Sequence, residues 1–228
     1  MSTLSHVLKT HLLALPDVSK LSSLRRFTSI FTQDQSADAL YFIEEGLVKL
    51  TRTNDSGDRI ILSISGPGDL IGEEVMSAEA SQYQADSEVL TAASLHRIPR
   101  DTLQRVLSQN GELASAVIDF LLNRRKMLAR KVELLCLHDV EYRILFYLAD
   151  LATLVGPSQE DEGYQLPITQ AELADLIGAT RETTSTTLNQ LERKGLVKLS
   201  RRLLTIPSPA LLRSPGSSSN TALKAETA

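Results

Sequence analysis

Several kinds of residue are scarce in this chain of 228 residues. It has one cysteine, Cys136, and no tryptophan, and aromatic residues make up 4% of it. A single thiol excludes a disulfide within the chain and an iron–sulfur cluster held by several cysteines of one chain. It is typical of a protein from a reducing compartment. Because 42% of the residues are hydrophobic and few are aromatic, we expect aliphatic cores.

Long apolar runs are also missing. No stretch of about 18 apolar residues occurs, so the sequence predicts no transmembrane helix. The short apolar segment 7–15 contains Lys9 and His11 and lacks a small-residue cleavage site. We expect an amphipathic helix there and no signal peptide. These absences predict a cytoplasmic protein that does not bind a membrane.

Motifs of common catalytic sites are absent as well. There is no nucleophile elbow, phosphate-binding loop, HExxH motif or pair of catalytic carboxylates. His6, His11, His96 and His138 are scattered, so we expect surface or capping roles for them and no haem or metal ligation. Cys136 is expected to be a buried packing residue, and a redox pair between two copies of it is the alternative. The sequence therefore predicts no enzyme and identifies no cofactor.

The sequence between residues 30 and 100 alternates short β-prone segments with turns. Gly, Asp, Pro and Asn separate the β-prone segments, which are residues 40–43, 47–52, 59–64, 88–92 and 94–99. Regular short strands with such turns are typical of a small antiparallel barrel or jelly roll.

From residue 111 to 137 the pattern is helical. Mostly apolar residues recur there at alternating spacings of three and four, namely Ala114, Val117, Leu121, Arg124, Leu128, Val132 and Leu135. This heptad pattern predicts a contact between two chains through Val117, Leu121, Leu128 and Leu135. A helix that packs on its own barrel is the alternative. Asp139 is the expected N-cap of the following helix.

Residues 169–195 have the pattern of two short helices joined by a glycine turn. Leu173, Leu176 and Ile177 share one side of the first helix, Gly178 begins the break, and the second helix runs from residue 181 to 194. Its exposed start carries a cation, an anion and several hydroxyls, which suit base edges and phosphates. The expected DNA contacts are Thr169, Thr180, Arg181, Glu182, Thr183, Ser185, Thr186 and Asn189.

A short hairpin is expected directly after these helices. Residues 196–199 and 203–206 are β-prone, and Arg201 and Arg202 lie between them, so the hairpin forms a wing with two basic residues at its tip. Residues 180–213 contain seven basic and two acidic residues, whereas the whole chain has a net charge of −4. A local basic patch favours phosphate binding. A solvated helical hairpin is the alternative.

The predicted fold is α+β. It combines an N-terminal antiparallel β jelly-roll barrel, a long dimerisation helix and a C-terminal winged helix-turn-helix. The expected boundaries are 1–110 for the barrel with its N-terminal helix, 111–138 for the long helix and 139–207 for the DNA-binding domain. The Pro- and Ser-rich residues 208–228 are expected to form a flexible tail.

This order of parts resembles the cyclic-AMP receptor / fumarate–nitrate regulator (CRP/FNR) family of bacterial transcription factors over about residues 28–207. The resemblance is carried by residues 46–50 (GLVKL), 68–73 (GDLIGE) and 180–183 (TRET), and by Asp139. It implies that Arg181 reads guanine and that Glu182 accepts a hydrogen bond from cytosine. The family's third reading residue, an Arg one turn later, is replaced by Thr186 here. The resemblance also implies a homodimer on double-stranded DNA with a near-palindromic site, and RNA polymerase as a partner.

The resemblance extends only in part to an effector pocket in the barrel. Gly72-Glu73 matches the family's Gly-Glu, whose carboxylate binds a ribose hydroxyl. The family's Arg-Ser or Arg-Thr pair, which neutralises the cyclic phosphate, is replaced by Tyr83-Gln84. A buried phosphate without a cation is too costly to expect, so the sequence predicts that cyclic AMP is not the effector.

On the long helix, the family's Thr-Ser pair, which receives the adenine, reads Leu128-Ala129. Arg124 is the cation there that could face the barrel and sense an anion, and a surface or inter-chain salt bridge is its alternative. The pocket candidates are thus Gly72, Glu73, Tyr83, Gln84, Arg124 and Leu128. The sequence predicts a DNA-binding regulator gated by an unidentified effector. A regulator controlled by its abundance alone and a ligand-binding adaptor module are the alternatives.

Overall fold

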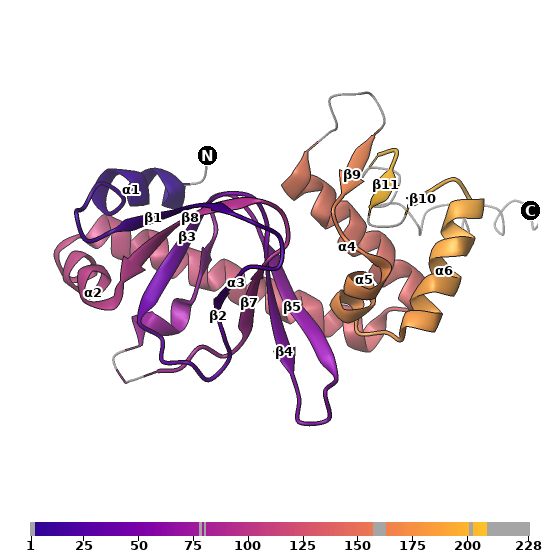
Figure 1. Ribbon diagram of the computed structural model, residues 1–228, viewed down its shortest axis with the longest axis horizontal. Helices are drawn as coiled ribbons and strands as arrows, with labels where there is room; N and C mark the ends of the chain where they lie inside the picture. The colour runs from indigo at the N-terminus through magenta and orange to yellow at the C-terminus, as the bar shows by residue number, and fades with distance from the viewer. Residues whose placement is uncertain (1–2, 78, 80, 157–162, 201–202, 209–228) are drawn as a thin grey trace, which may run out of the picture. The chain divides into compact units, whose positions relative to one another are not determined.

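The structure is a computed structural model that describes residues 3–77, 79, 81–156, 163–200 and 203–208 (Figure 1). The chain forms two compact units, Met1–Lys131 and Val132–Ala228. The first contains a β barrel with its helices, and the second contains a helix-turn-helix with a small sheet. The predicted α+β fold is confirmed. The long helix α3 (Gly111–Leu137) is shared between the two units and is not a separate segment.

Two antiparallel sheets make up the barrel. One has the order β1 (Ser19–Leu24), β8 (Ala93–Pro99), β3 (Ala39–Glu45) and β6 (Leu70–Ile71). The other has the order β2 (Ser29–Phe31), β7 (Asp86–Val89), β4 (Val48–Thr53) and β5 (Arg59–Ser65). The segments expected from the sequence correspond to β3, β4, β5, β7 and β8. The sequence of β1, SKLSSL, is mostly polar and exposed, so hydrophobic patterning did not predict it.

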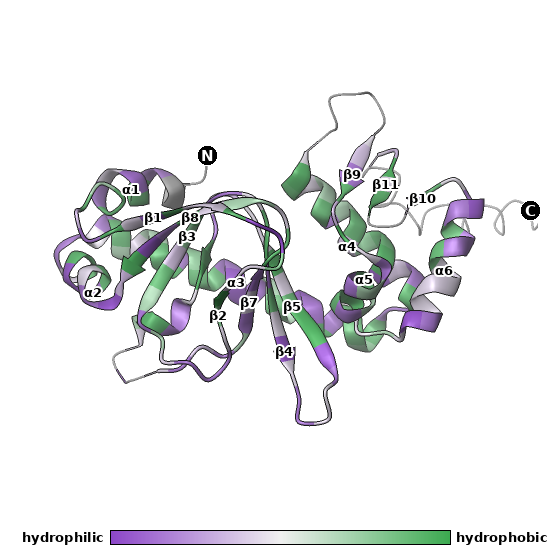
Figure 2. Cartoon of the chain, viewed as in Figure 1, coloured by the Kyte–Doolittle hydropathy of each residue, from purple (hydrophilic) through white to green (hydrophobic). Residues whose placement is uncertain are grey.

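Apolar side chains from both sheets and from the helices fill the barrel. Figure 2 colours the strands and helices by hydropathy, with apolar residues in green. Helix α1 (Thr3–His11) places Val7 and Leu8 in this core, and it lies about four residues before the segment 7–15 where it was expected. The 3₁₀ helix η1 (Glu73–Met76) and helix α2 (Arg100–Gln109) complete the first unit together with α3. The core is mainly aliphatic, as the composition indicates, and Phe31, Tyr41, Phe42 and Tyr83 are its aromatic members.

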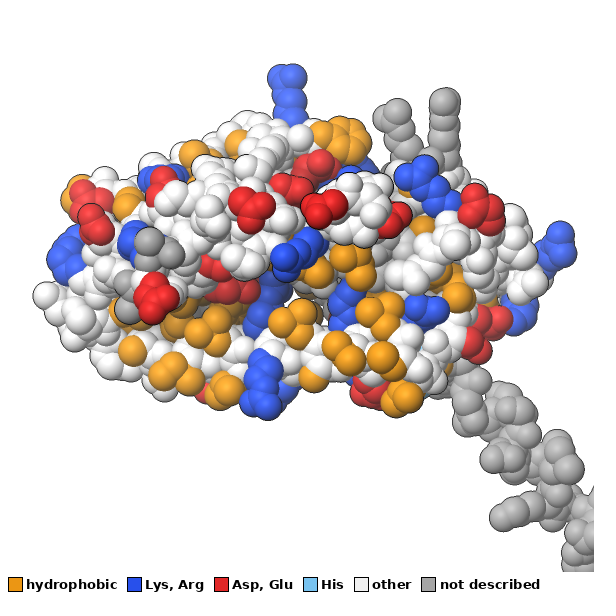
Figure 3. Space-filling view, turned by 90° about the horizontal axis from the view of Figure 1, so that it is seen from below, with side chains coloured by type: hydrophobic (Ala, Val, Ile, Leu, Met, Phe, Trp, Pro, Cys, Tyr) orange, Lys and Arg blue, Asp and Glu red, His pale blue; other side chains and the backbone are white. Residues whose placement is uncertain are grey.

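Helix α3 packs one face on the barrel and exposes another. Leu113, Ala116 and Val117 lie in the barrel core, and Val117 is 5% exposed. The prediction that Val117 belongs to a contact between two chains is therefore wrong, because the barrel already covers it. The face left uncovered carries Ile118, Leu121, Leu122 and Leu128, which are 37% to 57% exposed. We call these four residues the outer stripe; Figure 3 shows hydrophobic side chains in a row along this helix.

Near the end of α3 the structure corrects the predictions for Cys136 and Leu135. Cys136 is exposed, so the prediction of a buried packing residue is wrong. Leu135, expected at the contact between chains, instead lies against Gly178: a Cβ added at that glycine would be 2.8 Å from Leu135 Cδ2. At this end of α3 the heptad residue Leu135 is thus covered within its own unit by the turn at Gly178, whereas Cys136 stays exposed.

The second unit consists of three helices and a small antiparallel sheet. The helices are α4 (Val140–Val155), α5 (Gln170–Ile177) and α6 (Arg181–Arg193), and the sheet has the order β10 (Lys198–Leu199), β11 (Leu204–Ile206) and β9 (Tyr164–Leu166). Helix α4 is strongly apolar and supplies much of the core (Figure 2). The predicted N-cap is confirmed, because the Asp139 carboxylate accepts a hydrogen bond from Tyr142 N at 2.8 Å.

Two predicted features lie outside the described residues. They are the wing-tip residues Arg201 and Arg202, and nearly all of the predicted tail, from residue 209 onward. Within the described part of the chain, no helix combines the length and apolar character needed to cross a membrane.

Candidate nucleic-acid interface and effector site

Helix α5 begins with a capping box. Thr169 Oγ1 accepts from Glu172 N at 3.1 Å and donates to the Glu172 carboxylate at 2.9 Å, and that carboxylate also accepts from Thr169 N at 3.0 Å. A threonine hydroxyl has one O–H donor, and this one is occupied inside the chain. The donor of the Thr169 hydroxyl is therefore used within the chain, and the DNA contact of Thr169 stays a prediction.

The turn between α5 and α6 depends on a glycine. Gly178 has a φ of +63°, the left-handed region that favours glycine, and it ends α5. Two residues later Thr180 caps α6, because its hydroxyl accepts from Thr183 N at 3.2 Å. The turn therefore sets where the start of the second helix lies.

Helix α6 has a buried side and an exposed side. Thr184, Leu188 and Leu191 are fully buried against the rest of the unit. The side that remains exposed carries most of the predicted DNA contacts, namely Thr180, Arg181, Glu182, Thr183, Thr186 and Asn189, whereas Ser185 is half-buried. With 3.6 residues per turn, Glu182, Thr186 and Asn189 share one side of the helix, and Thr180, Arg181 and Thr183 belong to its exposed first turn.

The expected wing follows α6. Gly195, with a φ of +73°, ends the helix, and β10 then pairs with β11 through Lys198 and Thr205. The Glu192 carboxylate of α6 accepts from Leu199 N at 2.8 Å, which ties the hairpin to α6. The sequence did not predict β9, which adds a third strand beside β11.

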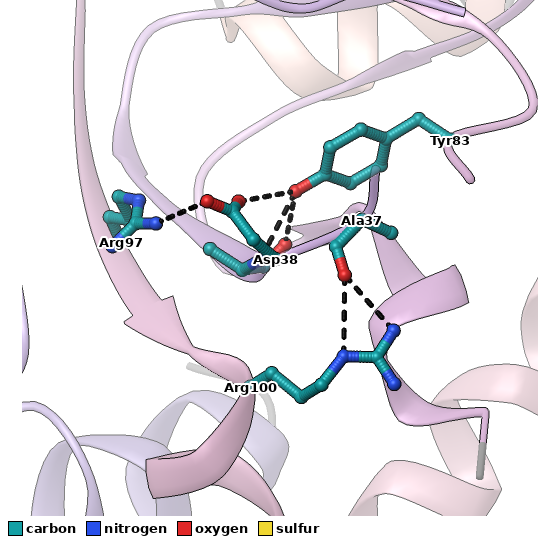
Figure 4. Close-up of polar contacts among 6 residues, drawn as sticks. Ala37, Asp38, Tyr83, Arg97 and Arg100 are labelled. Carbon is teal, nitrogen blue, oxygen red and sulfur yellow. Dashed lines mark hydrogen bonds and ion pairs between the residues drawn. The ribbon is translucent and has the colours of Figure 1, made fainter. Parts of the chain in front are cut away.

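In the barrel, Tyr83 is completely buried between other residues (Figure 4). Its ring stacks on Phe31 with 4.0 Å between ring centroids, and its hydroxyl donates to Ala39 O at 2.8 Å. Gly72, at a φ of +82°, accommodates the ring, because a Cβ there would lie 3.0 Å from Tyr83 Cε1. Burial raises the pKa of the Tyr83 hydroxyl, so this side chain stays neutral.

Two arginines, Arg97 and Arg100, bond to residues near Tyr83. Asp38 Oδ1 lies 3.4 Å from the Tyr83 hydroxyl, and Arg97 forms an ion pair with Asp38 at 2.8 Å (Figure 4). Arg100 donates to Ala37 O from both Nε and Nη2, and to Ser77 O from Nη1. The other pocket candidate beside Tyr83, Gln84, is exposed, which corrects its predicted place in the pocket.

Arg124 of α3 faces the barrel. Its guanidinium donates to Ser63 Oγ at 3.0 Å and to Ser65 Oγ at 3.3 Å, and it lies 3.4 Å from the Glu73 carboxylate. The interpretation of Arg124 as a surface or inter-chain residue is therefore wrong. The sequence could not show this arrangement, because the three partners come from β5 and η1, about 50 to 60 residues away.

Other ionisable groups in the first unit are also partly or fully buried. Burial raises the pKa of the Asp69 and Glu74 carboxyls, because it disfavours their charged forms. Lys131, which the sequence analysis did not single out, is buried and donates to Ile61 O at 2.8 Å, and burial lowers its pKa to about 8. Among the described residues, no three His, Cys, Asp or Glu are arranged to hold a metal ion.

Two regions of the chain match known protein families. Residues 21–110 match the cyclic nucleotide-binding domain, and residues 142–214 match the Crp-like helix-turn-helix domain. The chain belongs to the CRP/FNR family. This CRP/FNR-family chain is therefore a DNA-binding transcriptional regulator.

Relatives in the CRP/FNR family match most of the chain. The cAMP-activated global transcriptional regulator CRP of Salmonella typhimurium is 27% identical over 75% of this chain and 81% of that protein. The anaerobic regulatory protein of Bacillus subtilis is 24% identical over 81% of this chain and 78% of that protein. The structure of the c-di-GMP-responsive global regulator CLP of Xanthomonas campestris has a TM-score of 0.75 and 25% identity, and covers 88% of this chain and 98% of that one.

Proposed function

We propose that this CRP/FNR-family protein is a homodimeric, sequence-specific DNA-binding regulator whose barrel takes an effector other than cyclic AMP. The observation that carries the proposal is the exposed side of α6, where Arg181, Glu182 and Thr183 follow the Thr180 cap. A guanidinium and a carboxylate at the start of an exposed helix suit guanine and cytosine edges in a major groove.

The homodimer is supported by the outer stripe of α3. Ile118, Leu121, Leu122 and Leu128 form an apolar row on α3, and Met127 and Val132 are further exposed apolar residues of the same helix. A second copy of the same stripe is the partner that matches it, because a two-fold contact pairs a surface with itself. Two recognition helices then read successive major grooves about 34 Å apart, which requires a near-palindromic site. RNA polymerase is the partner that such a bound regulator would contact.

Selection of duplexes from a random pool tests this function. We expect the full-length protein to enrich inverted repeats whose half-site centres are about 10 base pairs apart. Affinity for the enriched site should fall steeply with salt, with a slope of about −0.9 for each phosphate contacted. Enrichment of no sequence, or binding without a steep dependence on salt, would remove the proposal and leave the adaptor alternative.

The effector should differ from an anionic cyclic nucleotide. Tyr83 occupies the place of the family's phosphate-binding cation with a neutral, buried ring, and Arg124 is already paired with Glu73. A cyclic phosphate in this barrel would therefore lack the charge-assisted partner that it needs. Control by abundance alone is the second candidate, and the same observation favours it, because the Tyr83 hydroxyl and ring already have partners within the chain.

Cyclic AMP is accordingly expected to leave this protein unchanged. Calorimetry should detect no binding below the millimolar range, and DNA affinity should be equal with and without the nucleotide, because a ligand shifts two states only by its differential affinity. Micromolar binding would contradict the prediction. Arg124→Ala would then show whether Arg124 leaves Glu73 to supply the missing charge.

A further inference from the structure

Arg143, in the first turn of α4, reaches across to the end of α5. Its Nη1 donates to Ile177 O at 2.7 Å and lies 3.5 Å from Gly178 O, and its Nε donates to Asp139 O at 3.4 Å. The first bond joins residues that are 34 positions apart in the sequence. The start of α4 is thus bonded to the residues that form the turn of the helix-turn-helix.

The turn is confined on two sides. Leu135 lies so near that a Cβ on Gly178 would be 2.8 Å from its Cδ2, and Arg143 Nη1 would be 4.0 Å from the same Cβ. Thr180, two residues on, caps α6 and precedes Arg181 directly. A displacement of the turn therefore moves the first DNA-reading residues with it.

Near the C-terminal end of α6 the Glu192 carboxylate accepts from Leu199 N, and the remaining side-chain contacts of the helix with the rest of the unit are less directional. Leu188 and Leu191 pack in the core, and such apolar contacts tolerate small rotations and shifts along the helix. At the far end of α6, Lys194 forms an ion pair with Glu141 at 2.7 Å, and both side chains are well exposed. Exposed ion pairs of this kind contribute little to stability. The charge-assisted bond from Arg143 has a defined direction and acts beside the start of the helix.

Arg143 also places positive charge near the exposed start of α6. Ile177 O is the last carbonyl of α5, where the helix dipole places partial negative charge, and the N-terminus of α6 lies three residues further on. A cation on that carbonyl offsets negative charge beside the surface that approaches phosphates. The bond to Ile177 O thus serves both the position and the electrostatics of the start of α6.

We propose that Arg143 is a positioning residue for base readout: it fixes the turn at Gly178 so that Arg181 and Glu182 meet base edges at hydrogen-bonding distance. This inference rests on the proposed function. Base-edge hydrogen bonds weaken steeply with small changes in distance and angle, whereas flexible contacts to phosphates adapt. Loss of Arg143 should therefore reduce sequence discrimination more than it reduces general DNA binding.

The test compares wild type, Arg143→Gln, Arg143→Lys and the control Arg105→Gln, which removes an arginine charge from α2 in the first unit. For each, affinity is measured on the selected site and on a scrambled duplex, across a salt series. We expect the ratio of the two affinities to fall about tenfold for Arg143→Gln and about threefold for Arg143→Lys. The scrambled duplex should be bound within about twofold of wild type, the salt slope should stay constant, and Arg105→Gln should behave as wild type.

The possible outcomes distinguish a failure of the proposed function from a failure of the positioning role of Arg143. If wild type shows no sequence preference, the proposed function fails before Arg143 is considered. If wild type is specific and Arg143→Gln keeps its affinity ratio, the positioning role is overturned. An equal loss on both duplexes with a shallower salt slope would make Arg143 a phosphate contact and would also overturn it. Should the Gln variant unfold, the folded Lys variant decides, by a reduced ratio or an unchanged one.

Discussion

Leu128→Glu is expected to convert the dimer into monomers. Leu128 is 49% exposed on the outer stripe, and in a two-fold contact each copy meets its equivalent or a close neighbour. The variant places two carboxylates of like charge in a mainly apolar contact, and a buried charge without its partner costs about 3–5 kcal/mol. The dissociation constant of the dimer should rise by more than about a hundredfold, since 1.4 kcal/mol corresponds to a factor of ten.

Sedimentation over a range of concentrations measures this change. Asn123→Glu is the matched control, because it adds the same charge to an exposed residue of α3, about 200° around the helix from Leu121. That control should remain a dimer. Leu121→Glu should resemble Leu128→Glu, and both should bind a full palindromic site much more weakly than wild type. An unchanged dimer in both Leu variants would show that the outer stripe is not the dimer contact.

Arg181→Ala is expected to relax base preference at one position in each half-site. The exposed guanidinium directly after the Thr180 cap is the group suited to two acceptors of a guanine. Loss of such a bidentate pair costs about 1–3 kcal/mol per half-site and removes discrimination at that base pair alone. Affinities for the selected site and its single-base variants give the measurement.

The wing arginines supply the comparison for that experiment. Arg201→Ala or Arg202→Ala should weaken binding to all sequences to a similar degree and make the salt slope shallower, as expected for phosphate contacts. If Arg181→Ala behaved in this way, the assignment of base readout to Arg181 would be wrong. If its loss were confined to one base pair, the contact would be with a base edge.

The local parts of this fold could be predicted from the sequence because their chemistry is local. Asp139 and Thr180 each bond a backbone N–H three residues ahead, and Gly178 adopts a left-handed φ, so each marks a helix boundary by itself. The same holds for the hairpin after Gly195. Glu172, three residues after Thr169, carried the signal of a capping box, and that signal would have shown that the Thr169 hydroxyl is occupied.

What the tertiary structure alone decided is which groups meet across long separations. A helix of the length of α3 offers more than one apolar face, and the barrel, not the heptad pattern, determined that Val117 and Arg124 turn inward while Leu121 and Leu128 stay exposed. The bond from Arg143 to Ile177 O likewise joins α4 to α5 with no pattern between them. Periodicity and capping describe neighbours along the chain, whereas side-chain partners depend on packing and on satisfying buried polar groups, which only the folded arrangement specifies.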